Sequence, residues 1–535
     1  MTFKKYSTAI FAALLAALVL AVYWQTTGFE FISLDDLEYT VLNPVVKGGL
    51  TGEGVKEAFT STHLHAYVPV TLLSFMADVE LFSLKPSGFH FTNTILHLLN
   101  TILLFAFLYR ATGSSWKSFF TAALWSIHPM RAESVAWVAE RKDVLAGFFF
   151  LAGLIAYCEY AKNRKPAFYI ATFSAMFLGL LSKPVLVVFP AVLLITDFWP
   201  LERVKEQGEN LKKLLIEKIP FIALSVLFSA LTVVIQRGTI YTIERRSALA
   251  RLSDIAASYV HYLKETAWPF GLIMKTRSPE AYVIGVWALA AGFLIIAFTF
   301  TAWRVRKTAP AVTAGWLWYL AVLFPVSGVL PLDFYFVADH FTYLPHIGLI
   351  VAIVWGAERL YSRFAKDLRP LTVAGGVIAV VLSVLCFRQV SLWKDDFTLF
   401  GYIDNVTGGK SALAKFSLGL ANSRAEKHRE AYDKYGEALA LEPNFVRVNG
   451  YKGMAAANLG RYREAADLLR KELEIFPGDR DFCTRLASIL ILAGDLPGAA
   501  RQGLENIKKW PEDKMAWDAV NYLGGEARAR EIAGR

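Results

Sequence analysis

Two segments of the chain combine acidic and basic side chains in patterns that could support chemistry. The first contains Asp35 and Asp36 within Leu34-Asp-Asp-Leu-Glu-Tyr39, soon after a long apolar run. A carboxylate in this position could act as a general base that deprotonates a hydroxyl nucleophile. The alternative is a solvated helix cap, which is the ordinary role of an isolated Asp-Asp pair.

The second segment, from His128 to Asp143, places seven ionisable side chains within sixteen residues. Lys183 and the pair Asp339-His340 follow later, each next to an apolar run. The cations could hold a phosphate group, and the carboxylates could orient a nucleophile. The candidate binding residues are Glu133, Arg141, Lys142, Asp143, Lys183, Asp339 and His340. The alternative is an internal salt-bridge network that holds the connector in place.

Metal ligation has no standard signature in this sequence. His63, His65, His90 and His97 lack the spacing of a zinc site, and His97 lies within an apolar run. The three cysteines are too far apart in sequence to form a metal motif or a disulfide framework. The sequence therefore assigns no metal ligands and no cofactor, and it leaves open whether the protein binds a divalent ion.

The elements that must position these residues are membrane-spanning helices. Of the 535 residues, 55% are hydrophobic and 19% are charged, whereas a typical soluble protein has about 25% charged residues. The mean hydropathy is +0.39. Apolar runs near the length that crosses a bilayer, about 17–25 residues, recur along most of the chain. Eleven spans are predicted, at 8–24, 89–109, 118–130, 144–160, 166–182, 184–199, 219–236, 282–303, 313–330, 342–358 and 371–388.

Positive charge predicts how these spans are oriented. Lys and Arg are concentrated in alternate connectors, from Arg110 and Lys117 to Arg363 and Lys366, whereas residues 331–341 contain neither. Because basic connectors remain cytoplasmic, the N-terminus is predicted to lie in the cytoplasm and the C-terminus outside. Both charged segments then lie on the external face, the first within a large external loop at 25–88. Residues 67–75 of that loop are predicted to form an interfacial helix.

The tail carries an internal repeat. Ala431, Ala465 and Ala499 are spaced 34 residues apart, and each is followed twelve residues later by a proline. This period and these small, Ala and Pro positions are typical of the tetratricopeptide repeat, a helix-turn-helix unit. The concave surface of such a stack suits a peptide or protein ligand. The alternative is a purely structural cap.

Three domains follow from these patterns. Residues 1–392 are predicted to form a transmembrane domain, 393–410 a connector, and 411–535 a domain of about three repeats. The predicted fold class is all-α, a polytopic membrane helix bundle of about 11 spans followed by an α-solenoid. The net charge of +10 is carried mainly by connectors between spans, so it indicates topology and not a nucleic-acid partner.

Several motifs resemble the transmembrane-and-tetratricopeptide-repeat glycosyltransferases, and the likeness extends over nearly the whole chain. They are Leu34–Tyr39 with Asn43-Pro44, Pro86–Asn93 with Leu96-His97, His128-Pro129, Glu133–Trp137, Glu140–Leu145, Ser182–Pro184 and Thr342–Pro345. The animal members are protein O-mannosyltransferases, and this compact chain is similar to the bacterial branch. The resemblance implies the GT-C fold and a bacterial inner-membrane location, with the repeats in the periplasm.

The resemblance also implies a site. An acidic residue of the first external loop is the catalytic base in the family, which points here to Asp35 or Asp36. Glu133, Arg141 and Asp143 match the second loop motif, and Lys183 matches the motif between spans five and six. Similar proteins have Asp-Arg-Tyr before Thr-Tyr-Leu-Pro, whereas this chain has Asp339-His340-Phe341. His340 would bind a phosphate as a cation only when protonated.

The function that these observations predict is a membrane hexosyltransferase. It would move a mannose-like hexose from a polyprenyl-phosphate donor to a protein hydroxyl on the external face, with the repeats helping to bind the acceptor. One alternative is transfer to a lipid or glycan. Another is a non-enzymatic membrane scaffold whose repeats bind proteins. A transporter is disfavoured, because its functional ionisable residues would be expected near the bilayer midplane, whereas here they cluster at one face.

Overall fold

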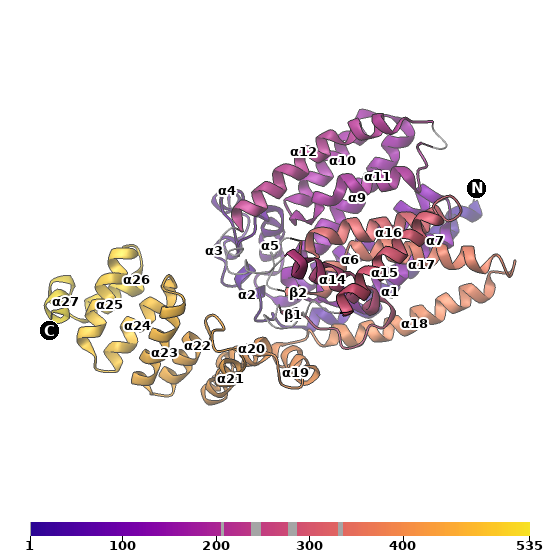
Figure 1. Cartoon of the computed structure of the whole chain (residues 1–535). Coiled ribbons are helices and arrows are strands. Elements are labelled where there is room, and N and C mark those ends of the chain that lie inside the picture. The colour runs from indigo at the N-terminus through magenta and orange to yellow at the C-terminus, as the bar shows by residue number, and fades with distance from the viewer. Residues whose placement is uncertain (1, 205–207, 237–247, 277–285, 330–334, 535) are drawn as a thin grey trace. The chain divides into compact units, whose positions relative to one another are not determined.

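The computed structural model describes residues 2–204, 208–236, 248–276, 286–329 and 335–534. It divides into two compact units, one up to Lys394 and one from Asp395 (Figure 1). The predicted all-α class is confirmed. Among the described residues the named strands are β1 (Lys275–Thr276) and β2 (Tyr335–Val337), which pair antiparallel. The two units are described separately below.

Each of the eleven predicted spans overlaps a helix of the first unit, and residues 282–285 and 330 of two spans lie outside the described residues. These helices are α1 (Thr2–Tyr23), α6 (Pro86–Thr112), α7 (Ser115–Ser126), α9 (Arg141–Asn163), α10 (Pro166–Leu180), α11 (Phe189–Phe198), α12 (Leu211–Ile235), α15 (Val286–Arg304), α16 (Pro310–Leu323), α17 (Pro345–Tyr361) and α18 (Arg369–Ser391). Six helical segments within the described residues are long and apolar enough to cross a membrane. The segments 166–180, 184–198 and 310–326 are apolar but shorter. The first unit is therefore an integral membrane helix bundle.

Proline and glycine fix where several of these helices begin and end. Pro86, Pro166, Pro310 and Pro345 each occupy the first turn of a helix, where the missing N–H would be unpaired in any case. Gly113 ends α6 in the left-handed conformation, with φ of 69°. Helices α9, α10, α11 and α12 then pack side by side (Figure 1).

The long first loop folds into short helices instead of remaining extended. They are η1 (Trp24–Gly28), α2 (Asp36–Tyr39), α3 (Pro44–Lys47), α4 (Gly52–Thr60) and α5 (Pro69–Phe82). Helix α5 covers most of the predicted interfacial segment, but Leu72, Phe75 and Met76 are buried, and the helix packs against α6 and α9. Helix α5 thus buries one apolar side against protein, whereas its Leu81 is 73% exposed, and its position at the membrane interface stays a prediction.

The charged connector from His128 to Glu140 is also helical and almost wholly buried. It contains η2 (Pro129–Arg131), α8 (Ala132–Ala136) and η3 (Val138–Glu140). The connector between α10 and α11 contains Lys183 and then η4 (Pro184–Val188), and η6 (Asp339–Thr342) precedes α17. Helix α14 (Ala248–Ala267) lies in the long segment between α12 and α15. Short helical turns thus carry four of the nine candidate site residues, whereas three others form the first turn of α9.

The second unit is a stack of helix pairs. Helix α19 (Asp396–Val406) lies within the predicted connector, and four pairs follow it. They are α20 (Ala412–Arg424) with α21 (His428–Leu441), α22 (Val448–Asn458) with α23 (Tyr462–Ile475), α24 (Arg480–Leu492) with α25 (Leu496–Lys509), and α26 (Lys514–Tyr522) with α27 (Glu526–Ala533). The fourth pair is shorter than the other three.

Close packing accounts for the small residues of the repeat. A Cβ atom on Gly419 would lie 2.4 Å from the ring of Tyr435, so only glycine allows this pair of helices to approach. The turns at Gly460 and Gly494 have φ of 77° and 81°, and Glu426 holds the same turn in the first pair at φ of 58°. These left-handed positions favour glycine. The small residues of the repeat are therefore explained by the close spacing of the paired helices and by the left-handed turns between them.

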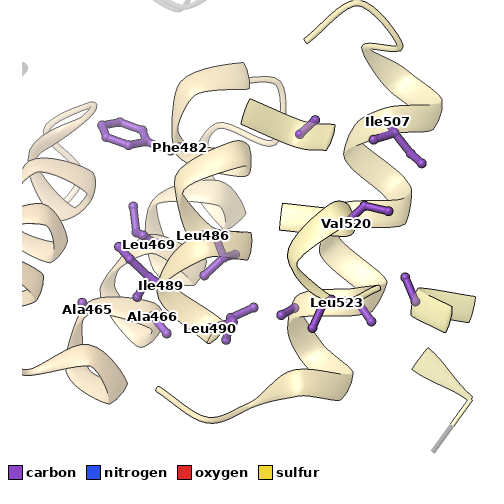
Figure 2. Packing of buried hydrophobic residues seen from close by; sticks show 14 of the residues in the cluster. Ala465, Ala466, Leu469, Phe482, Leu486, Ile489, Leu490, Ile507, Val520 and Leu523 are labelled. Carbon is purple, nitrogen blue, oxygen red and sulfur yellow. The ribbon is translucent and has the colours of Figure 1, made fainter. Parts of the chain in front are cut away.

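The later pairs share one hydrophobic core (Figure 2). Leu469 of α23, Leu486 of α24 and Val520 of α26 are at most 3% exposed and belong to one cluster. Each pair buries its apolar face mainly against its neighbours in the chain, which is the ordinary source of stability in a repeat array.

Leu469→Ala should therefore destabilise the tail by about 2–5 kcal/mol, because it removes buried methyl groups and leaves a cavity. Leu492→Ala is the matched control, since Leu492 is 59% exposed and its loss should cost no more than about 0.5 kcal/mol. The full chain is titrated with urea, and susceptibility of the tail to proteolysis at each concentration reports its unfolding. The two variants are compared with the wild type in this way. Equal effects of the two changes would contradict the packing described here.

Candidate functional site

A polar cavity of about 220 Å³ lies where the charged connectors meet. Four candidate residues line it, namely Asp35, Lys142, Lys183 and His340, together with Glu140, which was not among the candidates. Residues 64–68 of the first loop form another part of the wall, and Phe228, Leu231 and Ile235 of α12 form an apolar side. Segments distant in sequence thus enclose one small space that is charged on one side and apolar on the other.

The two lysines are held in place by carboxylates. Lys183 Nζ lies 2.8 Å from Glu140 Oε2 and 2.7 Å from Asp143 Oδ1, and Lys142 Nζ lies 3.2 Å from Glu140 Oε1. Lys142 also lies over the ring of Tyr39, 4.7 Å from its centroid. Burial lowers the pKa of Lys183, but Asp143 and Glu140 together raise it above its ordinary value. Lys183 is therefore a cation at neutral pH.

The neighbouring aspartates of the first loop have different environments. Asp35 is half-buried and lines the cavity. Asp36 is fully buried and accepts hydrogen bonds from the backbone N–H of Ile32 at 2.9 Å and of Ala139 at 2.7 Å. Burial raises the pKa of Asp36 to about 7. Asp36 therefore joins the first loop to the second, and Asp35 is the aspartate of the pair that lines the cavity.

Glu133 and His340 form a buried pair behind the cavity. His340 Nδ1 is hydrogen-bonded to Glu133 Oε1, and the other carboxylate oxygen accepts the backbone N–H of Asp339 at 3.2 Å. Burial raises the pKa of Glu133 and lowers that of His340 to about 3. His340 is therefore neutral at pH 7 and does not offer a cation to a phosphate.

Arg141 does not line the cavity, which revises the expectation that it contacts a phosphate. Its buried guanidinium forms an ion pair with Asp78 and donates to Asn93 Oδ1 at 2.7 Å and to the Phe89 carbonyl at 2.7 Å. It also lies 4.6 Å from the centroid of the Phe75 ring. With its donors directed to the protein, Arg141 positions α5 and α6 around the start of α9.

Glu133, Asp143 and Asp339 also lie just outside the cavity lining. Asp143 reaches the site through Lys183 and accepts a hydrogen bond from Ser134 Oγ at 3.2 Å. Asp339 is buried, and its carbonyl accepts the Thr342 hydroxyl at 2.7 Å. Glu133 and Asp143 are therefore placed to hold groups that face the cavity, whereas the contacts described for Asp339 are those of its backbone.

Sequence reasoning missed several residues of this site. Asp78 and Asn93 hold Arg141, and both are polar side chains that interrupt apolar runs, which was the available signal. Trp137 lines the cavity and stacks on Trp393, with ring centroids 5.7 Å apart. Nothing in the sequence indicated that residues of α12 line the cavity, because they form part of an apolar predicted span.

No group of three or more His, Cys, Asp or Glu side chains within the described residues is arranged to hold a metal ion. His63 and His97 instead have other partners. Asn43 lies 3.4 Å from the ring nitrogen of His63, and His97 is hydrogen-bonded to the Tyr343 hydroxyl at 2.8 Å.

Comparison with known proteins places the chain among one group of relatives. It is 34% identical over 161 residues to mouse protein O-mannosyl-transferase TMTC1, covering 27% of this chain and 16% of that protein. It is 22% identical over 528 residues to mouse protein O-mannosyl-transferase TMTC3, covering 89% of this chain and 56% of that protein. The Caenorhabditis elegans protein O-mannosyl-transferase F38B6.6 is 21% identical over 81% of this chain and 63% of that protein.

This chain is a homologue of the TMTC protein O-mannosyl-transferases. It spans about half the length of the relatives that it matches over most of its own residues. No family model matches it. Among solved structures, ArnT from Cupriavidus metallidurans bound to undecaprenyl phosphate is 15% identical, with a TM-score of 0.35 over 86% of this chain and 79% of that one. That score is too low to support a structural argument.

Arg141→Ala should destabilise the first unit by about 3–5 kcal/mol, because it leaves the buried carboxylate of Asp78 without its cation. Neutralising both partners, with Asp78→Asn and Arg141→Gln together, should recover part of that loss. Lys142→Gln is the control, because Glu140 keeps Lys183 as a partner. Thermal unfolding of the purified chain measures all three, and a fully stable Arg141→Ala protein would show that the ion pair is dispensable.

Proposed function

We propose that this homologue of the TMTC proteins is a membrane glycosyltransferase that takes a hexose from a polyprenyl-phosphate donor and transfers it to a protein hydroxyl. The observation that carries the proposal is the cavity in which Asp35, Lys142 and Lys183 meet the apolar wall of α12. A lipid-linked sugar phosphate needs both surfaces, because its head group is polar and anionic and its tail is apolar. The relatives' name, protein O-mannosyl-transferase, suggests mannose as the hexose and a protein as the acceptor.

The cavity residues suit the two halves of this reaction. Asp35 accepts the proton of the acceptor hydroxyl as its oxygen attacks C1 of the sugar. The bond between C1 and the phosphate oxygen breaks, and the polyprenyl phosphate leaves with the electron pair. Lys142 and Lys183 stabilise the negative charge that develops on this leaving group. Glu140 and Asp143 hold the two cations at the cavity before the donor arrives.

An adjoining apolar groove suits the polyprenyl chain. It has a volume of about 740 Å³ and lies between α11 and α12, with Val187 and Pro190 on one side and Val226 and Val233 on the other. Both the cavity and the groove use α12 and the segment that follows Lys183. A donor with its phosphate at Lys183 can therefore place its tail against the same pair of helices.

We place this cavity on the external face of a bacterial inner membrane, with the N-terminus in the cytoplasm. The concentration of Lys and Arg in the connectors at the other ends of the spans supports that orientation. The repeat unit would then lie outside as well, and its helix pairs suit the binding of a protein acceptor.

Asp35→Asn should lower the rate of transfer by about 100- to 10,000-fold, because it removes the proton acceptor and keeps the side chain's size. The affinity for the donor should change little. Asp36→Asn is the informative comparison, since Asp36 is bound to two backbone N–H groups away from the cavity and its loss should lower stability more than the intrinsic rate. The assay is transfer from a polyprenyl-phosphate hexose by purified protein. Normal turnover by Asp35→Asn would exclude Asp35 as the base, whereas the absence of transfer by the wild-type protein would favour a scaffold.

Removal of the unit Asp395–Arg535 should impair transfer to a folded protein acceptor at least ten times more than transfer to a short peptide. The reason is that a peptide needs only the cavity, whereas a protein gains affinity from a second surface. Comparing kcat/KM for the two acceptors in the full and shortened chains tests this. Equal losses would make the repeats a structural cap, and activity on lipid or glycan acceptors alone would identify a different acceptor class.

A further inference from the structure

A second cavity lies at the other end of α11 and α12. Phe228, Leu231 and Ile235, near the end of α12, line the proposed active site, whereas Leu211, Leu214 and Leu215 at the start of α12 line this second space. The two ends of the helix are roughly 36 Å apart at 1.5 Å per residue. The second cavity has a volume of about 650 Å³, within the range of pockets that bind small ligands.

Its walls are mainly aliphatic and aromatic. Leu194 and Phe198 of α11 face the three leucines of α12 across the space. Phe198, Leu211 and Leu215 are 39%, 58% and 45% exposed, so this apolar surface is open to the outside. An exposed apolar hollow on a membrane helix bundle is suited to an acyl chain and not to a water-soluble metabolite.

Two cations stand at the edge of the apolar space. Arg306 and Lys307, in the connector between α15 and α16, line the cavity together with Pro310. Arg306 lies over the ring of Trp303, 4.2 Å from its centroid, and donates to the Trp303 carbonyl at 2.8 Å. In the described part of the chain neither cation forms a salt bridge with a carboxylate. Their charge is therefore available to an anion.

The carboxylates of the cavity do not cancel this charge. Asp197 is 2% exposed and is bound by two buried cations, with Arg203 at 2.9 Å and Lys218 at 2.6 Å. Glu202 is the other acidic residue of the lining. With Asp197 neutralised, two cations and one carboxylate remain, which leaves the rim with net positive charge.

We propose that this cavity binds an anionic phospholipid, with the phosphate at Arg306 and Lys307 and an acyl chain against Leu211 and Leu215. Basic residues at the end of membrane helices attract anionic lipid head groups, and the apolar cavity supplies the surface for the tail. A free phosphate would have no use for the leucine wall, and a zwitterionic lipid would gain less from the two cations. This site is separate from the proposed glycosyl-transfer site, and nothing in that reaction requires it.

The test is lipid binding to the purified full chain, measured by native mass spectrometry with phosphatidylglycerol and phosphatidylcholine of identical acyl chains. Wild-type protein should retain the anionic lipid more tightly. The double variant Arg306→Gln, Lys307→Gln should lose about five-fold in affinity for each cation removed, about 25-fold in total. The control is Arg363→Gln, Lys366→Gln, which removes two exposed cations from another connector and should leave binding unchanged.

A second variant separates the cavity from general attraction to a positive surface. Leu215→Trp fills part of the apolar space without changing the charge, and it should also weaken binding of phosphatidylglycerol. Equal binding of the two lipids, undiminished binding after either change, or equal loss in the control would overturn the proposal. So would displacement of the bound lipid by a polyprenyl phosphate, because the cavity would then belong to the donor lipid.

Discussion

The carboxylate of Asp36 is the interaction on which the site depends. It accepts one backbone N–H from its own loop and one from Ala139 in the charged connector, so it fixes the two segments relative to each other. Glu140, Lys142 and Trp137 flank that contact in sequence and line the cavity with Asp35. Because Asp36 is fully buried, burial opposes its ionised form while two N–H groups favour it. A side chain that offered fewer acceptors would leave a buried donor unpaired.

Burial of charge governs the remainder of the first unit in the same way. A charge removed from water needs a partner, and the connectors supply one for almost every candidate residue. Arg141 is bound to Asp78, Lys183 to Glu140 and Asp143, while Glu133 and His340 are hydrogen-bonded to each other. At the other end of α12, Arg203 and Lys218 surround Asp197 and the Tyr157 hydroxyl. Both ends of this bundle are therefore fixed by ionic contacts, with apolar helices between them.

The charged connector can both hold itself in place through salt bridges and provide side chains that bind a ligand, so the two interpretations of its sequence are compatible. Arg141 serves structure alone, since its guanidinium is fully enclosed. Lys142 and Lys183 serve both purposes, because each holds Glu140 and still reaches the cavity. A lysine has three donors, so a carboxylate contact leaves capacity for a phosphate oxygen. The same side chain can therefore stabilise the loop and meet a ligand.

The sequence by itself determined the helix bundle, the repeat tail and the segments that carry charge. Apolar runs and a 34-residue period are local patterns. The length of an apolar run predicts a membrane helix, and the spacing of the repeat predicts a helix pair. Only the tertiary structure shows that Asp35 lines the cavity and Asp36 does not, that Arg141 lies outside the lining, and that α12 forms part of the wall. These outcomes depend on which side of a short helical turn faces a segment one hundred or more residues away. Adjacent residues with identical chemistry, such as the two aspartates, differ only in that direction, and the linear order of residues does not encode it locally.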